Sequence, residues 1–527
     1  MQLYPTPMGA TRSDRFEVVA EEREIFVERW CDVSYARFAM AGPVAIEIRA
    51  AGPVHDVRVV PRAAIAGLVV EGERIRFTLL RPANLVVMVA GMERLFVLAD
   101  PVEPVGAVPV IGAPGVTSVV AYGAEPDGER IVTGELQSAI DDAAARGGGT
   151  VVVPAGTFVT GTLCIRSRVT LYLAAGAVLR GSAEPSDYPI DPGRTETGSD
   201  ASIARADERY RGETMTFSRL IWFDGAEDAH LAGRGTIDGN GSHLRRARNA
   251  VPNLIRVRGG QRVTIRDVLL RDAAAWTLHI LGARHVGVEN VKIINDRGNL
   301  NTDGIDPDSA QDVAVRGCLI YTKDDAVCVK ATNNSDVLQD VARIEVTGNV
   351  VSSLDAALKV GTESLAARFT DIVFRDNDVL DSGRAVSIVV RDGATYERIA
   401  FRDIRVAPGV RHLIEQVVGV RDARAQALGL PMLGRIEQLV FEDIDAPGFT
   451  PPASNRTWYT QFRPGDAGGN AAEGAVAVFA GADAAHAVRG LVLRNVVVRG
   501  ERLRDREAAA RVAGLTIGPH VDDVTIE

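Results

Sequence analysis

Aspartate is concentrated in one short stretch of the chain, residues 301–330, with the sequence NTDGIDPDSAQDVAVRGCLIYTKDDAVCVK. The stretch holds a first group and, 21 residues on (324 − 303 = 21), a second group: Asp303, Asp306 and Asp308, then Asp324 and Asp325. Carboxylates held close together do not all ionise, so one of them keeps a proton at working pH. A protonated carboxyl beside an ionised one that activates water is the minimum that glycoside hydrolysis requires.

Two other interpretations of these aspartates stay open at this point. Acid-rich turns bind hard cations such as Ca²⁺ through oxygen ligands, which a polysaccharide lyase would use. Aspartate side chains also cap turns by accepting hydrogen bonds from their own backbone, with no chemical role. The three interpretations differ in whether the two groups meet in space.

A repeat of two short β-like runs joined by a polar pair indicates that they do meet. Units such as VTIRDVLLRD, VGVENVKIIN and VAVRGCLIYT begin at residues 263, 286 and 313, and further units begin at 344, 372 and 399. Short strands without intervening helices favour a right-handed parallel β-helix. Equivalent positions of successive coils lie about 4.8 Å apart in such a fold. The second aspartate group is therefore expected to stack on the first in one solvent-facing patch.

The chain is expected to have two domains. Residues 1–112 contain short alternating runs separated by Gly, Pro, Asn and Asp, which predict a β-sandwich-like domain. Residues 108–116, VPVIGAPGV, are the expected linker, and residues 113–527 form the β-helix. A helix is expected within 128–149, where ELQSAIDDAAAR precedes three glycines, and it would cap the open end of the β-helix.

Composition limits the partners. A hydrophobic content of 46% and a charged content of 24% are typical of a soluble globular protein, and the net charge of −10 argues against nucleic acid. No long apolar run and no apolar segment near Met1 are present, so neither a membrane span nor a signal peptide is expected, and a cytoplasmic location is predicted. The four cysteines lack metal-ligand spacing.

The aspartate motifs also resemble those of a known family. Asn301-Thr302-Asp303 followed by Asp324-Asp325 is similar to the NTD and DD motifs of glycoside hydrolase family 28, the polygalacturonase family. Further similar segments are GGGTVVVPAGTF (147–158), GRGTIDGNGS (233–242), AAWTLHI (274–280) and NTDGIDPDS (301–309). The resemblance extends over about residues 116–405 and implies the parallel β-helix and single-displacement inversion.

The resemblance also assigns roles. It implies that Asp324 is the general acid that protonates the glycosidic oxygen, that Asp303 and Asp325 activate the attacking water, and that no metal or other cofactor is required. Two motifs of the family are missing. Its Gly-His-Gly segment falls near residues 354–359 (LDAALK), and its Arg-Ile-Lys segment near 385–392 (AVSIVVRD). Galacturonate specificity is therefore open, and a neutral or rhamnose-linked sugar is an alternative.

Several further residues are predicted to bind the substrate, each with a structural alternative. Lys330 would be a sugar-binding cation, or is an exposed charge. Arg391 would bind a carboxylate or sulfate through two hydrogen bonds. Trp276 would stack on a sugar ring, or fills the core. The whole predicted substrate-binding set is Asn301, Lys330, Lys359, Glu363, Arg391, Trp276 and His279. Residues 193–217 and 405–480, which include Glu415, Gln416, Trp458 and Tyr459, are expected to wall the cleft.

The sequence thus predicts an inverting, exo-acting glycoside hydrolase that cleaves an oligosaccharide, with a pectin fragment as the candidate substrate. A polysaccharide lyase or epimerase on the same β-helix is the first alternative, and it would depend on a cation or a basic proton abstractor. A carbohydrate-binding solenoid without catalysis is the second alternative.

Overall fold

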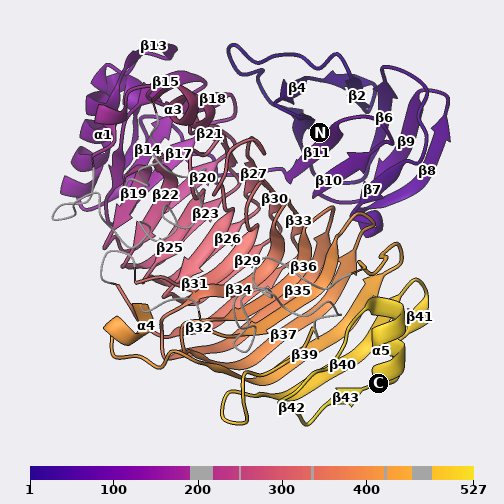
Figure 1. The fold of residues 1–527 in the computed structure, drawn as a ribbon. Coiled ribbons are helices and arrows are strands. Elements are labelled where there is room, and N and C mark those ends of the chain that lie inside the picture. The colour runs from indigo at the N-terminus through magenta and orange to yellow at the C-terminus, as the bar shows by residue number, and fades with distance from the viewer. Residues whose placement is uncertain (190–217, 249–250, 334–336, 421–423, 454–477) are drawn as a thin grey trace.

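The computed structural model describes residues 1–189, 218–248, 251–333, 337–420, 424–453 and 478–527. A compact β-domain at the N-terminus lies against the side of a long parallel β-helix that extends to the C-terminus (Figure 1). The predicted fold class, a right-handed parallel β-helix with an N-terminal β-sandwich, is confirmed. The proposed boundary at residues 112 and 113 falls between the last strand of the sandwich and the first strand of the helix.

Two sheets form the N-terminal domain. Their strands are β1 (Gln2–Leu3), β2 (Phe16–Ala20), β3 (Arg23–Ile25), β4 (Val27–Trp30), β5 (Val33–Met40), β6 (Val44–Ala50), β7 (Arg58–Val60), β8 (Ile65–Glu71), β9 (Arg74–Leu79), β10 (Ala83–Met88) and β11 (Arg94–Pro101), with the 3-10 helix η1 (Arg62–Ala64). One sheet has the order β1-β5-β11-β10-β7 with β4 beside β5, and the other β3-β2-β6-β9-β8. Buried residues of both sheets, such as Phe38 and Ile48, form the core between them.

One wall of the β-helix is a sheet of nine parallel strands, one from each coil. In spatial order they are β16 (Leu163–Ile165), β19 (Arg219–Asp224), β22 (Asn253–Arg258), β25 (Leu278–Leu281), β28 (Ile305–Asp308), β31 (Val327–Ala331), β34 (Ala356–Ser364), β36 (Arg384–Val390) and β38 (His412–Val418). Coils that are consecutive in the sequence are neighbours in this sheet, as the repeat predicts.

A second sheet of 23 strands forms the rest of the wall. Its strands are β12 (Val116–Ser118), β13 (Asp127–Ile131), β14 (Gly149–Val153), β15 (Gly156–Thr160), β17 (Val169–Leu173), β18 (Ala177–Gly181), β20 (His230–Gly233), β21 (Thr236–Asp238), β23 (Gln261–Arg266), β24 (Leu269–Arg271), β26 (Arg284–Glu289), β27 (Lys292–Ile294), β29 (Gln311–Arg316), β30 (Leu319–Thr322), β32 (Val341–Thr347), β33 (Val350–Ser353), β35 (Arg368–Val379), β37 (Thr395–Val406), β39 (Arg435–Ala446), β40 (Val488–Val498), β41 (Glu501–Arg502), β42 (Val521–Asp522) and β43 (Thr525–Ile526).

The polar pairs of the repeat are turns within this larger sheet. The second member of a pair has a left-handed backbone, with φ of 70° at Asp267, 51° at Asn290 and 56° at Asp376. Asp, Asn and Gly adopt this conformation most readily, so the repeated RD, EN and RG pairs have a conformational cause. Inside the helix, equivalent side chains stack from coil to coil, as Phe374 does on Phe401 with ring centroids 4.8 Å apart.

Helices lie mainly near the ends of the coil. The predicted N-terminal cap is α1 (Thr133–Ala145), which buries Leu136, Ala139, Ile140 and Ala143 against the first coils. The other short helices are η2 (Val119–Tyr122), η3 (Pro185–Asp187), α3 (Gly241–Arg248), α4 (Arg424–Ala427) and α5 (Arg506–Ala513). Among the described residues no helix has the length and apolarity needed to cross a membrane.

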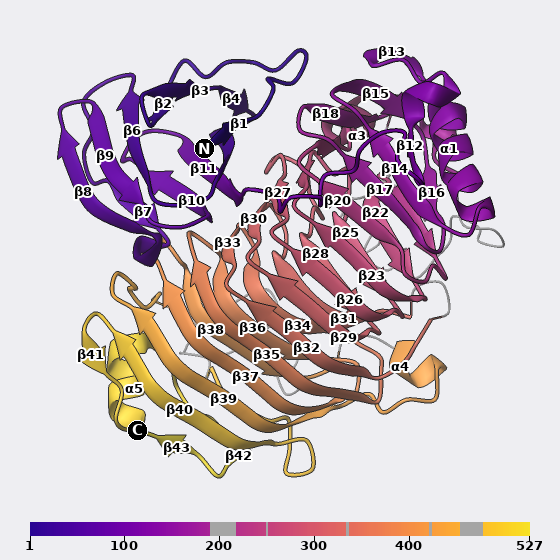
Figure 2. The same ribbon diagram turned by 180° about the vertical axis from the view of Figure 1, so that it is seen from behind.

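The N-terminal domain lies beside the part of the β-helix that holds β27, β30 and β33 (Figure 2). Strand β5 and its neighbours make the contact. Val33 and Tyr35 pack with Leu269, Ile294 and Leu319 in one apolar cluster shared by the two domains. Buried ion pairs also cross the contact: Asp100 bonds to Lys292, and Glu28 lies 2.7 Å from Arg271. The strands that receive the domain, β24, β27 and β30, each precede a turn that leads into the nine-stranded sheet.

Candidate active site

The turn before each strand of the nine-stranded sheet places the aspartates. Asp303 stands two residues before Ile305 at the start of β28, and Asp325 two residues before Val327 at the start of β31. Because Ile305 and Val327 are paired across neighbouring coils, the two turns stack. One oxygen from each of Asp303, Asp324 and Asp325 lies within 4.8 Å of the other two. The two groups of aspartates therefore lie together, as the repeat predicts.

The exposure of this cluster differs from the expectation of a solvent-facing patch. Asp303 and Asp325 are each only 3% exposed, and Asp324 is half-buried. Burial penalises the charged form of a carboxylate, so each ionised member requires a cation or hydrogen-bond donors nearby. The surroundings of the three carboxyl groups therefore determine which of them hold protons.

Asp325 is held in its ionised form. The Lys359 ammonium lies 2.6 Å from its Oδ2, and the backbone N–H of Ala356 donates to its Oδ1 at 3.3 Å. Burial alone would raise the pKa of Asp325, but Lys359, Lys330 and Arg384 outweigh burial and lower that pKa.

Asp324 has the opposite tendency. Burial and the charge of Asp325 raise the pKa of Asp324 above its usual value, although Lys359 pulls it down. Its Oδ1 accepts one hydrogen bond, from the backbone N–H of Asp325, at 2.9 Å. The adjacent pair thus contains one carboxyl that favours the proton and one that favours the charge, the division that acid/base catalysis needs.

Asp303 shares a single cation with Asp306. The Lys330 ammonium lies 2.9 Å from Asp303 Oδ2 and 3.0 Å from Asp306 Oδ1. Burial raises the pKa of Asp303 well above its usual value and that of Asp306 to about 7, in each case against the pull of Lys330. One cation between two buried carboxyl groups leaves about one proton on the pair near neutral pH. Lys330 donates a hydrogen bond to Asp303, while one oxygen of Asp303 and both oxygens of Asp306 have no hydrogen-bond partner.

Trp276 and His279 are predicted to bind substrate. In the structure both are buried beside the carboxylate cluster, where Trp276 contacts Lys330 and His279 contacts Asp308. The ammonium of Lys330 lies 4.1 Å from the centre of the Trp276 ring, whose plane meets the His279 ring edge-on. His279 Nε2 lies 2.8 Å from Asp308 Oδ2, and Thr332 also donates to Asp308. Burial lowers the pKa of His279 to about 4, so this imidazole is neutral at pH 7.

The other predicted binding residues divide into two groups. Asn301 and Glu363 are half-buried; Asn301 precedes Asp303 in its turn with a φ of 54°, and Glu363 is near enough to Lys330 to influence its charge. Arg391 lies elsewhere, and its guanidinium donates to the backbone oxygen of Val420 at 2.6 Å. Trp458, Tyr459 and the whole of 193–217 lie outside the described residues.

The distance along the sheet explains the position of Arg391. In the ladder, Arg384 stands at the position of Ala356, and Ala356 in turn stacks on the turn of Asp325. Arg391 follows Arg384 by seven residues of extended strand, which span roughly 23 Å at about 3.3 Å per residue. Arg391 therefore stands just beyond the end of β36 that is far from the turn of Asp325.

Sequence reasoning missed Arg384, which stands two coils from Asp325. Its side chain forms ion pairs with Asp355 and, at 3.4 Å, with Glu415 Oε2, which also accepts from Ser387 Oγ at 2.6 Å. The length of the repeat could have located Arg384. Arg384 follows Ala356 by one coil (384 − 356 = 28), and the two residues are paired in the sheet.

Comparison with known proteins agrees with this geometry. The family model described as glycosyl hydrolases family 28 matches residues 199–408, the part of the β-helix that contains all the acids of the cluster. Residues 199–408 of this chain are therefore similar to glycosyl hydrolases family 28.

Two curated relatives illustrate the likeness. A probable polygalacturonase of Vitis vinifera is 29% identical over 229 residues, which are 41% of this chain and 44% of that protein. The exo-poly-alpha-D-galacturonosidase of Dickeya chrysanthemi is 28% identical over 271 residues, which are 42% of this chain and 43% of that protein. The matched part thus spans less than half the length of these relatives.

A solved structure extends the likeness of fold. The family 28 exopolygalacturonase of Yersinia enterocolitica aligns with 92% of this chain, over 96% of its own length, with a TM-score of 0.56 and 16% sequence identity. At that identity the likeness concerns the architecture. It includes most of the N-terminal domain as well as the family 28 β-helix.

Proposed function

We propose that this protein is a glycoside hydrolase that cleaves a glycosidic bond of an oligosaccharide by inverting acid/base hydrolysis. One observation carries the proposal: three carboxyl groups converge within 4.8 Å, and their surroundings drive Asp324 towards the protonated form and Asp325 towards the charged form. The match of residues 199–408 to the model of glycosyl hydrolases family 28 supports the same class of reaction.

Asp324 is the general acid in this proposal. It is the most exposed of the three carboxyl groups, so a sugar in the cleft can reach it, and its raised pKa keeps a proton available. Transfer of that proton to the glycosidic oxygen neutralises the leaving group as the bond to the anomeric carbon breaks.

Asp325 and Asp303 together activate the attacking water. Asp325 is kept ionised by Lys359, and the Lys330 ammonium, 2.9 Å from Asp303 Oδ2, favours the charged form of Asp303 against the effect of burial. A water molecule that donates to both carboxylates loses a proton to one of them as its oxygen bonds to the anomeric carbon. Attack by water on the face opposite to the leaving group inverts the anomeric centre.

Taken alone, the spacing of the carboxyl groups favours retention of the anomeric configuration over inversion. Oxygens within 4.8 Å are closer to the separation of about 5–5.5 Å of retaining enzymes than to about 6.5–9.5 Å of inverting ones. Retention, however, needs one carboxylate to bond to the sugar, and each candidate is already held by a lysine: Asp303 by Lys330 and Asp325 by Lys359. Two held carboxylates are better suited to orienting a water than to attacking carbon.

The proposed substrate is a pectin-derived oligosaccharide attacked from its end. The names of the relatives, a polygalacturonase and an exo-poly-alpha-D-galacturonosidase, support α-linked galacturonate and exo action. The position of Arg391, away from the acids, leaves a neutral sugar as the competing substrate. Monosaccharide and pentamer as the first products from a hexamer would support exo action, whereas early trimers would contradict it.

A polysaccharide lyase is the second candidate, because three carboxylates this close also form a possible cation site. Turnover of oligogalacturonides, rhamnogalacturonan fragments and neutral oligosaccharides, with and without EDTA, separates the two. New reducing ends without a gain in ultraviolet absorbance support the hydrolase. An unsaturated product, recognised by the ultraviolet absorbance of its conjugated double bond, or a need for added cation supports the lyase. Binding of a sugar without any turnover would favour the non-catalytic solenoid.

A further inference from the structure

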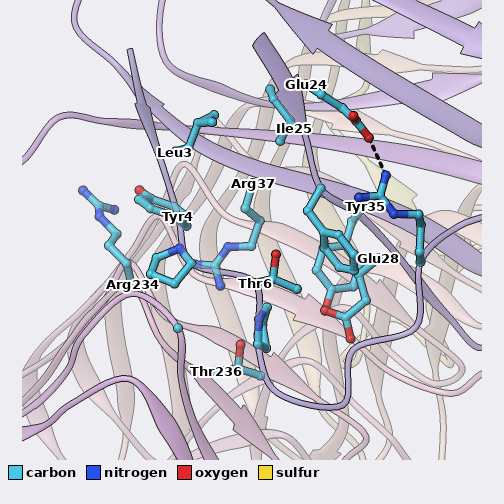
Figure 3. A pocket seen from close by; sticks show the side chains of 15 residues that line it. Leu3, Tyr4, Thr6, Glu24, Ile25, Glu28, Tyr35, Arg37, Arg234 and Thr236 are labelled. Carbon is cyan, nitrogen blue, oxygen red and sulfur yellow. Dashed lines mark hydrogen bonds and ion pairs between the residues drawn. The ribbon is translucent and has the colours of Figure 1, made fainter.

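The contact between the N-terminal domain and the β-helix has two parts of different character. At the first coils it encloses a cavity of about 250 Å³, whose walls include Tyr4 and Arg37 from the N-terminal domain and Arg234 from the β-helix (Figure 3). Nearer the aspartate cluster it consists of direct polar contacts that Asp32 and Arg94 make. This second part of the contact leads to the proposed active site.

Asp32 and Arg94 are neighbours in the N-terminal domain. Strands β5 and β11 are parallel, and Val33, which follows Asp32, is paired with Arg94. Both side chains bond to the β-helix. Asp32 accepts from Tyr321 Oη at 2.7 Å, and Arg94 forms an ion pair with Asp381. The domain is therefore attached to β30 and to the turn that follows β35.

Arg297 links these two contacts. Its guanidinium lies over the ring of Tyr321, 3.6 Å from the ring centre, and its Nη1 lies 3.5 Å from Asp381 Oδ2. Arg297 also donates to Ser352 Oγ, which donates in turn to Asp381 Oδ1 at 2.9 Å. The Asp381 carboxylate thus lies between one arginine of each domain. The Arg297 side chain is only 8% exposed, so its charge is screened less than a surface charge would be.

The β-helix residues of this group stand close to the turns that carry the active-site carboxyl groups. Arg297 lies in the turn between β27 and β28, which also holds Asp303. Tyr321 precedes Asp324 by three residues (324 − 321 = 3), and Asp381 lies in the turn before β36. The N-terminal domain is therefore attached where the chain enters the nine-stranded sheet.

A second set of hydrogen bonds leads from this group to the backbone of Asp324. Ser353, which follows Ser352, donates through Oγ to the backbone oxygen of Asp324 at 2.7 Å. Thr322, which follows Tyr321, donates to the same oxygen at 2.7 Å. Both donor side chains are fully buried. A shift of Ser352 or Tyr321 would therefore move the two hydroxyl groups that hold the peptide of Asp324.

We propose that Arg94, with Asp32 beside it, is a positioning residue for Asp324. It acts through Asp381 and Arg297. The inference rests on the proposed function, because it concerns the orientation of the proposed general acid. A carboxyl that gives up its proton must lie within hydrogen-bond reach of the glycosidic oxygen, and a misplacement of about 1 Å can cost about 10²-fold in rate. The N-terminal domain thereby contributes to the reaction from outside the carboxylate cluster.

The variants Arg94→Met and Asp381→Asn test the proposal on the full chain. Each removes the ion pair between the domains, so each should lower kcat about tenfold or more while KM changes by less than about twofold. Both changes break the same contact, and the double variant should be no slower than the slower single variant. Arg94 contacts Asp381 through one nitrogen, so Arg94→Lys, which keeps the charge, should recover most of the lost kcat. Asp381→Asn carries the test if Arg94→Met does not fold.

Hydrogen exchange followed by mass spectrometry tests the same contact without a substrate. In Arg94→Met we expect faster exchange in peptides that cover the turns 295–304 and 322–326, and unchanged exchange in the first coils. Glu103→Ala is the matched control, because Glu103 accepts from Tyr172 Oη at 2.8 Å in a contact between the domains at the first coils. This control should alter neither kcat nor exchange in the two turns.

The outcomes separate this proposal from the proposed function. Unchanged kcat in Arg94→Met, additive losses in the double variant, or unchanged exchange in both turns would overturn the positioning role of Arg94. An equal loss of kcat in Glu103→Ala would also overturn it, since any weakened contact between the domains would then have the same effect. Faster exchange in the two turns of Arg94→Met, together with no turnover of any sugar by the wild type, would support the contact and refute the hydrolase.

Discussion

The ammonium of Lys359 lies 2.6 Å from Oδ2 of Asp325, and the two residues come from neighbouring coils of the nine-stranded sheet. Both side chains are almost fully buried. The pair therefore has two consequences: it stabilises the fold, and it keeps Asp325 charged beside Asp324, whose pKa is raised. The proposed division of labour between base and acid depends on this contact.

Lys359→Met tests that dependence. Loss of the cation removes the main cause of the lowered pKa of Asp325, so the acid limb of the pH profile of kcat/KM should move to higher pH. Breaking a buried pair costs roughly 3–5 kcal/mol in unfolding free energy. A carboxylate with a lowered folded pKa stabilises the protein above its unfolded pKa of about 3.9 and loses that contribution as pH falls. The cost of Lys359→Met, measured by denaturant unfolding, should therefore shrink from pH 7 to pH 3.5. An unmoved acid limb would contradict the role of Lys359.

Asp324→Asn removes the proposed acid while it keeps the shape of the side chain. We expect kcat to fall about 10²–10⁴-fold, the usual contribution of general acid catalysis, with KM and the thermal midpoint little changed because Asp324 is half-buried. The matched control is Asp403→Asn, at an exposed turn with a φ of 51° that asparagine also adopts. Equal loss of activity in the control, or full activity in Asp324→Asn, would exclude Asp324 as the acid.

Asp306→Asn tests whether Asp306 holds the proton of the pair that Lys330 bridges. Its pKa of about 7 lies above the unfolded value, so the folded state binds the extra proton between about pH 4 and 7. Unfolding free energy therefore declines as pH rises through this window, by at most about 1.4 kcal/mol for each pH unit crossed. Asn imitates the protonated form, and the variant should lose less stability than the wild type between pH 5 and pH 8. Parallel declines in both proteins would show that Asp306 is ionised throughout.

Arg391→Met separates a structural arginine from a substrate-binding one. The Arg391 guanidinium donates two hydrogen bonds to the backbone oxygen of Val420, and its loss should lower the unfolding free energy by about 1–3 kcal/mol. Activity on an oligogalacturonide should change less than tenfold, because the residue lies about seven strand residues from the acids. A large rise in KM for an acidic oligosaccharide, but not for a neutral one, would restore the role predicted from the sequence.

Removal of divalent cations should leave turnover unchanged. Lys330 and Lys359 place ammonium groups within 3.0 Å of Asp303, Asp306 and Asp325, where a cation would otherwise neutralise these acids. We expect rates within twofold before and after dialysis against EDTA, followed by readdition of Ca²⁺ as a control. Loss of turnover with EDTA and its return with Ca²⁺ would favour a cation-dependent lyase.

The stacked acids were predictable because the fold follows from a sequence period. Short β runs with Asp, Asn or Gly at the left-handed turn recur through the chain, and this recurrence places the turn of Asp325 on that of Asp303. The burial of the cluster was not predictable, because it depends on packing between segments distant in sequence. The position of Lys330 was not predictable for the same reason. Lys330 was expected to bind the sugar, but it contacts Asp303, Asp306 and Trp276.

Strand β5, VSYARFAM, shows why the contact between the domains was missed. A strand with one solvent-facing side alternates between apolar and polar residues, but β5 is covered on both sides. Phe38 faces the sandwich core and Tyr35 faces the β-helix, so the alternation that identifies a surface strand is absent. Arg37 then has the appearance of an ordinary charged residue in sequence, although its two unpaired nitrogens are buried at the interface.

The cytoplasmic location stays a prediction.

The configuration of the first-formed product tests the central claim most directly. Proton NMR can follow the anomeric signals during hydrolysis of an α-linked oligogalacturonide, or of the best substrate from the panel, before mutarotation mixes the anomers. If Asp324 is the acid and Asp303 with Asp325 activates water, the β-anomer appears first, and Asp324→Asn abolishes it. Initial appearance of the α-anomer would show retention through a covalent intermediate and would contradict the proposed use of the two lysine-held carboxylates.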